Sequence, residues 1–112
     1  MATIGDVSLE VGRIGNFMEF ARVWFRVSFS GGERNLNMPF LIYAELYGRD
    51  DAVGRRMSHE MRDHRAGEIG RAKVRPDGNA FVDVEIRREW EIGSHEGGIE
   101  ECRALVTACP HL

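Results

Sequence analysis

A chain of 112 residues has the usual size of one domain, and it can bury enough surface to fold without a metal or a disulfide. Its formal net charge of −3 at pH 7 argues against nucleic-acid binding, which normally requires a basic excess on one face. No stretch approaches the roughly 20 apolar residues that span a bilayer. We expect no secretory signal, because the first six residues contain no basic region followed by an apolar run. We therefore expect a cytoplasmic protein with no membrane and no nucleic-acid partner.

The first expected strand covers residues 6–11, where apolar and polar residues alternate. Val7, Leu9 and Val11 then face the core, because successive side chains of a strand point to opposite faces of its sheet. A break that contains two glycines follows at 12–16. The next strand is therefore expected to begin near residue 18.

The strongest pattern in the sequence is a pair of alternating stretches, 18–29 and 36–47. Their apolar residues lie mainly at odd positions in the first stretch and at even positions in the second. A period of two indicates strands that each turn one face toward a core. Because a connection with two adjacent glycines joins the stretches, we expect them to form a β-hairpin.

The connection 30–35 sets the expected register of this hairpin, which pairs Phe29 with Leu36 and Phe25 with Phe40. In that register, the face turned away from the core brings together three residues from each strand. They are Arg22, Trp24, Arg26, Leu41, Tyr43 and Tyr47.

Residues 51–66 fit two structures equally well. Apolar residues spaced by four between 53 and 61 favour one short helix around residues 51–64. Alternation over 57–61 favours an irregular edge strand instead, and Gly54 weakens a helix by about 1 kcal/mol. Both structures remain open for this segment.

A second hairpin is expected from a polar strand at 68–75, a turn at 76–79 and a long strand at 80–92. On the long strand, the apolar residues at even positions face the core, and the charged residues at odd positions face water. A glycine-containing loop at 93–98 leads to the closing strand at 101–108.

Together these segments predict an all-β protein, with one antiparallel β-sandwich domain of six to seven strands over residues 1–112. Cys102 is expected to be a small core residue and Cys109 a free thiol, because their separation along a strand prevents a disulfide. The core is expected to gather apolar side chains that share a parity within each strand. They are Val23, Phe25, Val27, Phe40, Ile42, Val82, Val84 and Val106.

Charge is unevenly distributed along the chain. Residues 49–75 contain eight basic and five acidic residues, whereas residues 83–101 contain two basic and seven acidic ones. Neighbouring strands of opposite charge attract each other across a sheet, which is one explanation of the asymmetry. The other explanation is a head-to-tail contact between copies of the chain, in which rim charges steer association.

His59, Glu60 and His64 are the best candidates for a metal-dependent enzyme. The two histidines are five residues apart, whereas the helical zinc-protease motif places them four apart on one face. At this spacing the side chains point apart on a helix and on a strand, so only a loop could bring them together. We expect solvated loop histidines, with neither a metal nor a cofactor.

The aromatic and arginine face is the stronger functional candidate, because Trp, Tyr and Arg are enriched at binding hot spots. We therefore expect a non-enzymatic protein-interaction module that self-associates, as a homodimer or larger homo-oligomer, or binds another protein. The same aromatic side chains suit a carbohydrate or another small ligand, which is the alternative function. The structural alternative is that a terminal strand or residues 51–66 cover this face and make it a second small core.

Overall fold

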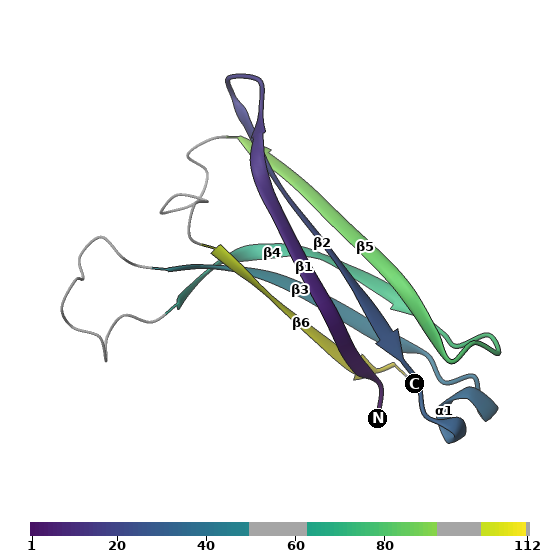
Figure 1. The fold of residues 1–112 in the computed structure, drawn as a ribbon. Helices are drawn as coiled ribbons and strands as arrows, with labels where there is room; N and C mark the ends of the chain where they lie inside the picture. The colour runs from purple at the N-terminus through teal and green to yellow at the C-terminus, as the bar shows by residue number, and fades with distance from the viewer. Residues whose placement is uncertain (50–62, 92–101, 112) are drawn as a thin grey trace.

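The computed structural model describes residues 1–49, 63–91 and 102–111. In these ranges the chain forms six strands and one short helix (Figure 1). The elements in chain order are β1 (Thr3–Ile14), β2 (Met18–Ser28), α1 (Gly31–Asn35), β3 (Phe40–Arg49), β4 (Asp63–Val74), β5 (Phe81–Glu91) and β6 (Cys102–Pro110).

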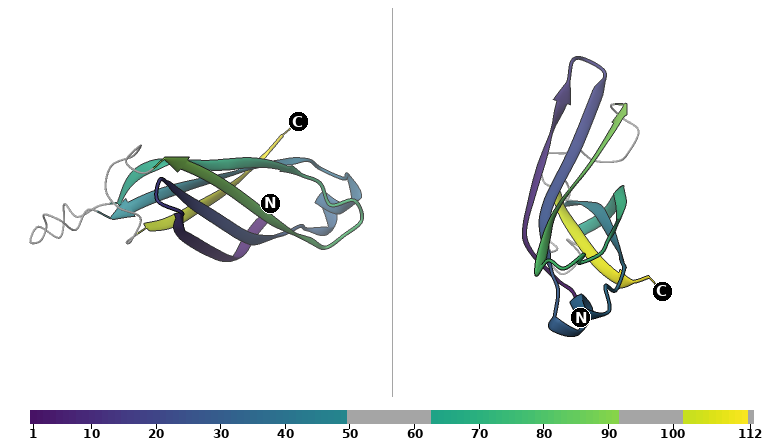
Figure 2. Two further views of the ribbon diagram at one scale, coloured as in Figure 1. Left: turned by 90° about the horizontal axis from the view of Figure 1, so that it is seen from above. Right: turned by 90° about the vertical axis from the view of Figure 1, so that its right-hand side faces the viewer.

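The strands form two antiparallel three-stranded sheets, with the orders β1-β2-β5 and β4-β3-β6. The sheets lie one over the other as two layers, with apolar side chains packed between them (Figure 2). The tip of the β1–β2 hairpin extends beyond the other sheet at one end of the molecule (Figure 1). The expected class, an all-β antiparallel sandwich, is therefore confirmed.

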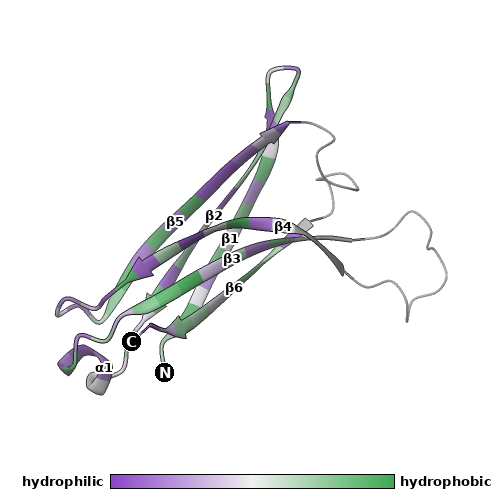
Figure 3. Cartoon of the chain, turned by 180° about the vertical axis from the view of Figure 1, so that it is seen from behind, coloured by the Kyte–Doolittle hydropathy of each residue, from purple (hydrophilic) through white to green (hydrophobic). Residues whose placement is uncertain are grey.

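The core lies between the sheets, where the odd positions of β2 meet the even positions of β3. Hydrophilic and hydrophobic bands alternate along β5 in Figure 3, as a strand with one buried face requires. All eight predicted core residues belong to this cluster. Val23, Phe25, Val27, Phe40 and Ile42 are buried, and Val82, Val84 and Val106 are half-buried against them.

The expected hairpin of 18–29 and 36–47 is wrong, because β2 and β3 lie in different sheets. Helix α1 replaces the expected turn. The Ser30 hydroxyl accepts a hydrogen bond from the N–H of Glu33 (3.2 Å), and the Glu33 carboxylate accepts one from the N–H of Ser30 (2.7 Å). This capping box starts the helix through which the chain passes from one sheet to the other.

The expected hairpin of 68–75 and 80–92 is also wrong as a pair of hydrogen-bonded strands. Its turn is present: the N–H of Asn79 donates to the C=O of Pro76 (2.8 Å), and the two residues between them have φ angles of 48° and 84°. This turn nevertheless leads from β4 in one sheet to β5 in the other. Turn residues reverse the chain, but they do not decide whether the flanking strands pair.

A bulge in β1 changes which side chains face the core. The register with β2 shifts over residues 5–8, and Asp6 has a φ of 55°. Because a bulge adds a residue without a partner, the alternation changes phase at this point. Val7, expected in the core, is therefore 44% exposed, whereas Leu9 and Val11 pack against the core as expected.

The helix expected around residues 51–64 falls mostly on residues 50–62, which lie outside the described residues, and residues 63–64 belong to β4. The loop expected at 93–98 lies outside them too. Cys109 is an exposed free thiol, as expected. Within the described part of the chain, no helix is long and apolar enough to cross a membrane.

Candidate binding face

The six residues of the predicted binding face lie on two different faces of the sandwich. Figure 2 shows the two sheets as separate layers, with β2 in one and β3 in the other. Side chains that point outward from β2 and from β3 therefore lie on opposite sides of the molecule. The prediction of a single face is therefore wrong. One side carries Arg22, Trp24 and Arg26, and the other carries Leu41, Tyr43 and Tyr47.

We call the outward face of sheet β1-β2-β5 the Trp24 face. Its register sets Ser8, Trp24 and Glu85 side by side across the three strands. Trp24 is 36% exposed, and the Cζ of Arg22 lies 4.5 Å from the centroid of its indole ring. Strand β1 lies beside β2 and strand β6 lies in the other sheet, so neither terminal strand covers this face. Residues 51–66, the other segment expected as a possible cover of this face, fall largely outside the described residues.

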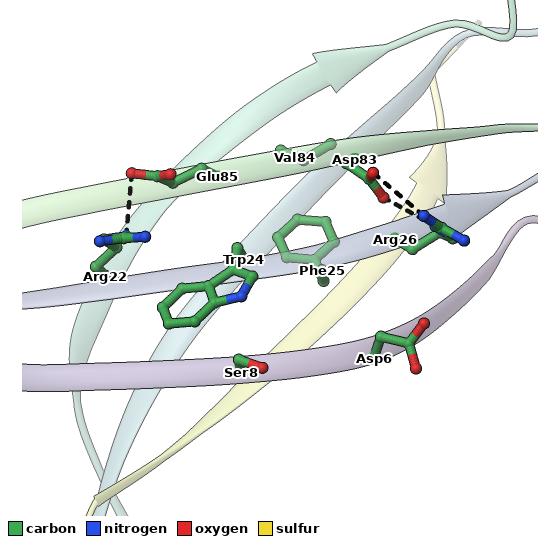
Figure 4. A pocket seen from close by; sticks show the side chains of 9 residues that line it. All are labelled: Asp6, Ser8, Arg22, Trp24, Phe25, Arg26, Asp83, Val84 and Glu85. Atoms are coloured by element: carbon green, nitrogen blue, oxygen red, sulfur yellow. Dashed lines mark hydrogen bonds and ion pairs between the residues drawn. The ribbon is translucent and has the colours of Figure 1, made fainter.

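Carboxylates on the neighbouring strands contact both guanidinium groups of β2, and Figure 4 shows the two that lie on β5, Glu85 and Asp83. Arg22 lies between Glu10 on β1 (Nη1 to Oε1, 3.4 Å) and Glu85 on β5 (Nε to Oε2, 3.2 Å). Arg26 donates two hydrogen bonds to Asp83, of 2.9 and 3.3 Å. These bonds hold the pKa of Asp83 below its ordinary value and raise the pKa of Arg26. Both groups are therefore charged at neutral pH.

Two phenylalanines outside the six predicted residues add aromatic surface to the Trp24 face. The Cζ of Arg26 lies 3.8 Å from the centroid of Phe81, and the Cζ of Arg87 lies 4.5 Å from the centroid of Phe20. The Phe20 ring packs over Gly12, where an added Cβ would come within 2.8 Å of the ring. Phe20 shares the parity of the other outward β2 residues, so alternation alone could have found it. Placing Phe81 required the β2–β5 register.

A shallow depression of about 550 Å³ surrounds Trp24 (Figure 4). The indole and two guanidinium groups stand on β2, and the carboxylates stand on β1 and β5. This combination can hold a partner by stacking and by charge-assisted hydrogen bonds. Among the described residues that line the depression, Ser8 supplies a hydroxyl and none is a histidine.

Most of the predicted metal candidates fall outside the described part of the chain. His59 and Glu60 lie outside it, and His64 lies in β4 opposite Gly48, in a strand instead of the expected loop. Among the described residues there is no group of three or more His, Cys, Asp or Glu side chains that could hold a metal ion.

We call the outward face of sheet β4-β3-β6 the Tyr43 face. The Cζ of Arg71 lies 5.0 Å from the centroid of Tyr43, and the Cζ of Arg103 lies 5.5 Å from that of Tyr47. Arg71 also donates a hydrogen bond to Glu68 (2.7 Å). Each predicted tyrosine therefore does stack with an arginine, but these arginines come from β4 and β6 and not from β2.

The chain matches no protein-family model, no curated protein and no solved structure. Of the two outward faces, the Trp24 face combines an exposed indole with a depression lined by charged side chains.

Proposed function

We propose that this chain is a non-enzymatic protein-interaction module that binds its partner through the Trp24 face. The observation that supports this proposal is the exposed indole of Trp24, which stands between Arg22 and Arg26 in a depression. Tryptophan and arginine are among the residue types that contribute most to binding at protein interfaces. The indole also retains apolar surface that a partner would remove from water.

Neighbouring side chains hold these residues in place before any partner arrives. Arg26 is fixed by its two hydrogen bonds to Asp83, and Arg22 lies between carboxylates on both adjacent strands. Ordering a mobile side chain at an interface costs about 0.5–1.5 kcal/mol. Because these side chains already contact carboxylates on the adjacent strands, we expect binding at the Trp24 face to lose less conformational entropy than binding at a face whose arginines have no such contacts.

Ion pairs alone do not make a binding site, because exposed pairs contribute about 0–1 kcal/mol and occur on many protein surfaces. A solvated face does not need aromatic surface, yet Trp24 and Phe81, which is 45% exposed, both lie outward on the same sheet. A test of the proposal should therefore remove aromatic surface and leave the ion pairs in place.

A photo-cross-linking side chain at Ser28 provides this test. Ser28 is exposed at the end of β2 and shares the parity of Trp24, so the indole stays in place. In cells we expect adducts with a discrete partner, and we expect Trp24→Ala to remove them. Leu36→Ala is the matched control, because Leu36 is 73% exposed but lies next to α1. The proposal is wrong if no adduct forms, or if adducts persist in Trp24→Ala.

A carbohydrate or another small polar ligand is the second candidate, because an indole and carboxylates line the same depression. Sugars stack on indole rings and form hydrogen bonds with such charged groups. Arg22 already lies over the indole, so a sugar would have to displace it or use the opposite ring face. Titration with a panel of oligosaccharides, followed by isothermal titration calorimetry, tests this function. A saturable heat of binding that Trp24→Ala abolishes would favour it over protein binding.

A further inference from the structure

We infer that the partner of the Trp24 face is a second copy of this chain, which docks by its Tyr43 face. The inference rests on the proposed function, in which the Trp24 face is the binding surface, and it adds the identity of the partner. The two faces lie on opposite sides of the sandwich, so one copy can use one face while the other face stays available.

The described side chains of the two faces carry opposite net charge. The described outward side chains of the Trp24 face include six carboxylates and three guanidinium groups, whereas those of the Tyr43 face include two carboxylates and three cations. The acidic set is Asp6, Glu10, Asp83, Glu85, Glu89 and Glu91, with Arg22, Arg26 and Arg87 among them. The basic set is Arg71, Lys73 and Arg103, with Glu45 and Glu68 among them.

Each face also carries an exposed charge that has no ion-pair partner among the described residues. Glu91 on β5 and Lys73 on β4 are both exposed, and neither forms an ion pair with a described residue. Docking of the Tyr43 face on the Trp24 face would bring cations toward carboxylates, which steers association and favours this orientation. Two Trp24 faces against each other would instead bring together two acidic surfaces.

Both faces also offer aromatic and apolar surface between these charges. Trp24 and Phe81 are exposed on one face, and Leu105 is exposed on the other, beside the two tyrosines of β3. Tyr43 and Tyr47 each have a guanidinium group close to the ring. A contact between the faces would therefore combine stacking with charge pairing, which is the composition typical of interface hot spots.

The area of the faces is sufficient for a specific contact. Strands lie about 4.8 Å apart and rise about 3.3 Å per residue, so three strands of about eleven residues cover roughly 500 Å². Contact over the whole face would bury at least that area on each copy, since side chains make the surface rougher than a plane. The total reaches the roughly 1,000 Å² that a specific interface should exceed.

A contact between unlike faces has a recognisable consequence for assembly. Each copy can dock one neighbour on its Trp24 face and another on its Tyr43 face, so the association is head-to-tail and does not stop at a dimer unless a ring closes. A symmetric dimer would use the same face on both copies and would stop at two chains.

Sedimentation velocity of Trp24→Ala, of Tyr43→Ala and of their mixture tests the inference. The wild type should form species larger than a dimer as its concentration rises, and about 0.5 M salt should weaken this association. Each variant has lost one of the two faces, so its association should weaken by roughly thirtyfold or more. The mixture should form a complex of two chains and nothing larger, because it retains one intact Trp24 face and one intact Tyr43 face.

Charge reversal gives a second, independent pair of variants. Glu85→Lys and Lys73→Glu change exposed residues on the Trp24 face and the Tyr43 face, so both should fold. Each should associate less than the wild type, and their mixture should again form a complex of two chains. Circular dichroism of every variant checks that the loss of association is not a loss of fold.

Two results would overturn the inference and leave the proposed function intact. One is a wild type that stays monomeric at high micromolar concentration while the Ser28 cross-linker still captures another protein in a Trp24-dependent way. The other is association that Trp24→Ala abolishes and Tyr43→Ala does not change, which would indicate a symmetric dimer through two Trp24 faces. Association that neither substitution changes would contradict both proposals.

Discussion

At the residue scale, two glycines allow a neighbouring side chain to approach the backbone closely. A Cβ added to Gly12 would come within 2.8 Å of the Phe20 ring, and one added to Gly70 would come within 2.6 Å of the Cγ2 of Ile86. Gly12 and Phe20 belong to the Trp24 face, where they lie opposite each other on β1 and β2. Gly70 belongs to β4, and Ile86 reaches it from β5 in the other sheet. Gly70 therefore sets how closely the two sheets can pack at this point.

We expect Gly70→Ala to lower the free energy of unfolding by about 1–3 kcal/mol, the usual cost of overpacking a core. The added methyl group would overlap with Ile86 unless the sheets move apart. Gly32→Ala is the control, because nothing lies within 4 Å of an added Cβ in α1 and alanine favours a helix. Urea unfolding measures both effects. An unchanged urea midpoint for Gly70→Ala would show that the two sheets can move apart at this point with little loss of stability.

At the element scale, the alternation of apolar residues predicted the faces of the strands but not their neighbours. The odd positions of β2 and the even positions of β3 are buried as expected, yet these strands face each other across the core. Both arrangements bury the same side chains, so the connection decides between them. That connection does contain a readable signal, because Ser30 followed three residues later by Glu33 is a capping box. The bulge at residues 5–8 has no such signal, because it depends on the partner strand.

The same capping box should make stability depend on pH. Burial opposes the ionisation of Glu33, but hydrogen bonds from the N–H of Ser30 (2.7 Å) and from the N-terminal ammonium (2.9 Å) outweigh it. The pKa of Glu33 therefore lies below its ordinary value of 4.5. A lowered folded-state pKa stabilises the fold above the pKa of the unfolded chain, and this contribution is lost as the pH falls through the folded-state pKa.

We therefore expect Glu33→Gln to be less stable than the wild type at about pH 6, with a difference that shrinks toward about pH 3. Urea unfolding at both pH values measures this change. Glu91→Gln, which removes an exposed carboxylate at the end of β5, should differ little from the wild type at either pH. A deficit for Glu33→Gln that is equal at both pH values would mean that the charge of Glu33 does not stabilise the connection.

At the scale of the whole molecule, the sandwich separates residues that the sequence pattern grouped together. Parity within each strand correctly predicted that the six residues of the candidate site face outward from their sheets. Their grouping depended on pairing β2 with β3, which the fold does not contain. The separation changes what the molecule can do, because two faces on opposite sides can hold two neighbours at once. A single face would allow one.

Two adjacent residues of β2 show which side of sheet β1-β2-β5 is covered. Phe25 is 3% exposed and Trp24 is 36% exposed. We expect Phe25→Ala to lose roughly 3–5 kcal/mol of unfolding free energy, because it leaves a cavity between the sheets. Trp24→Ala should lose no more than about 1 kcal/mol, as substitutions on an uncovered surface usually do.

Urea unfolding of both variants tests this difference, at a concentration low enough that association does not add to the stability of the wild type. Val23→Ala is the control, because Val23 is a second buried residue on the same strand. It should also lower the free energy of unfolding, as Phe25→Ala does. If Trp24→Ala loses as much as Phe25→Ala, then other residues cover the indole in the folded monomer. The Trp24 face would then be a second core, and neither a partner nor a second copy could bind there without unfolding part of the chain.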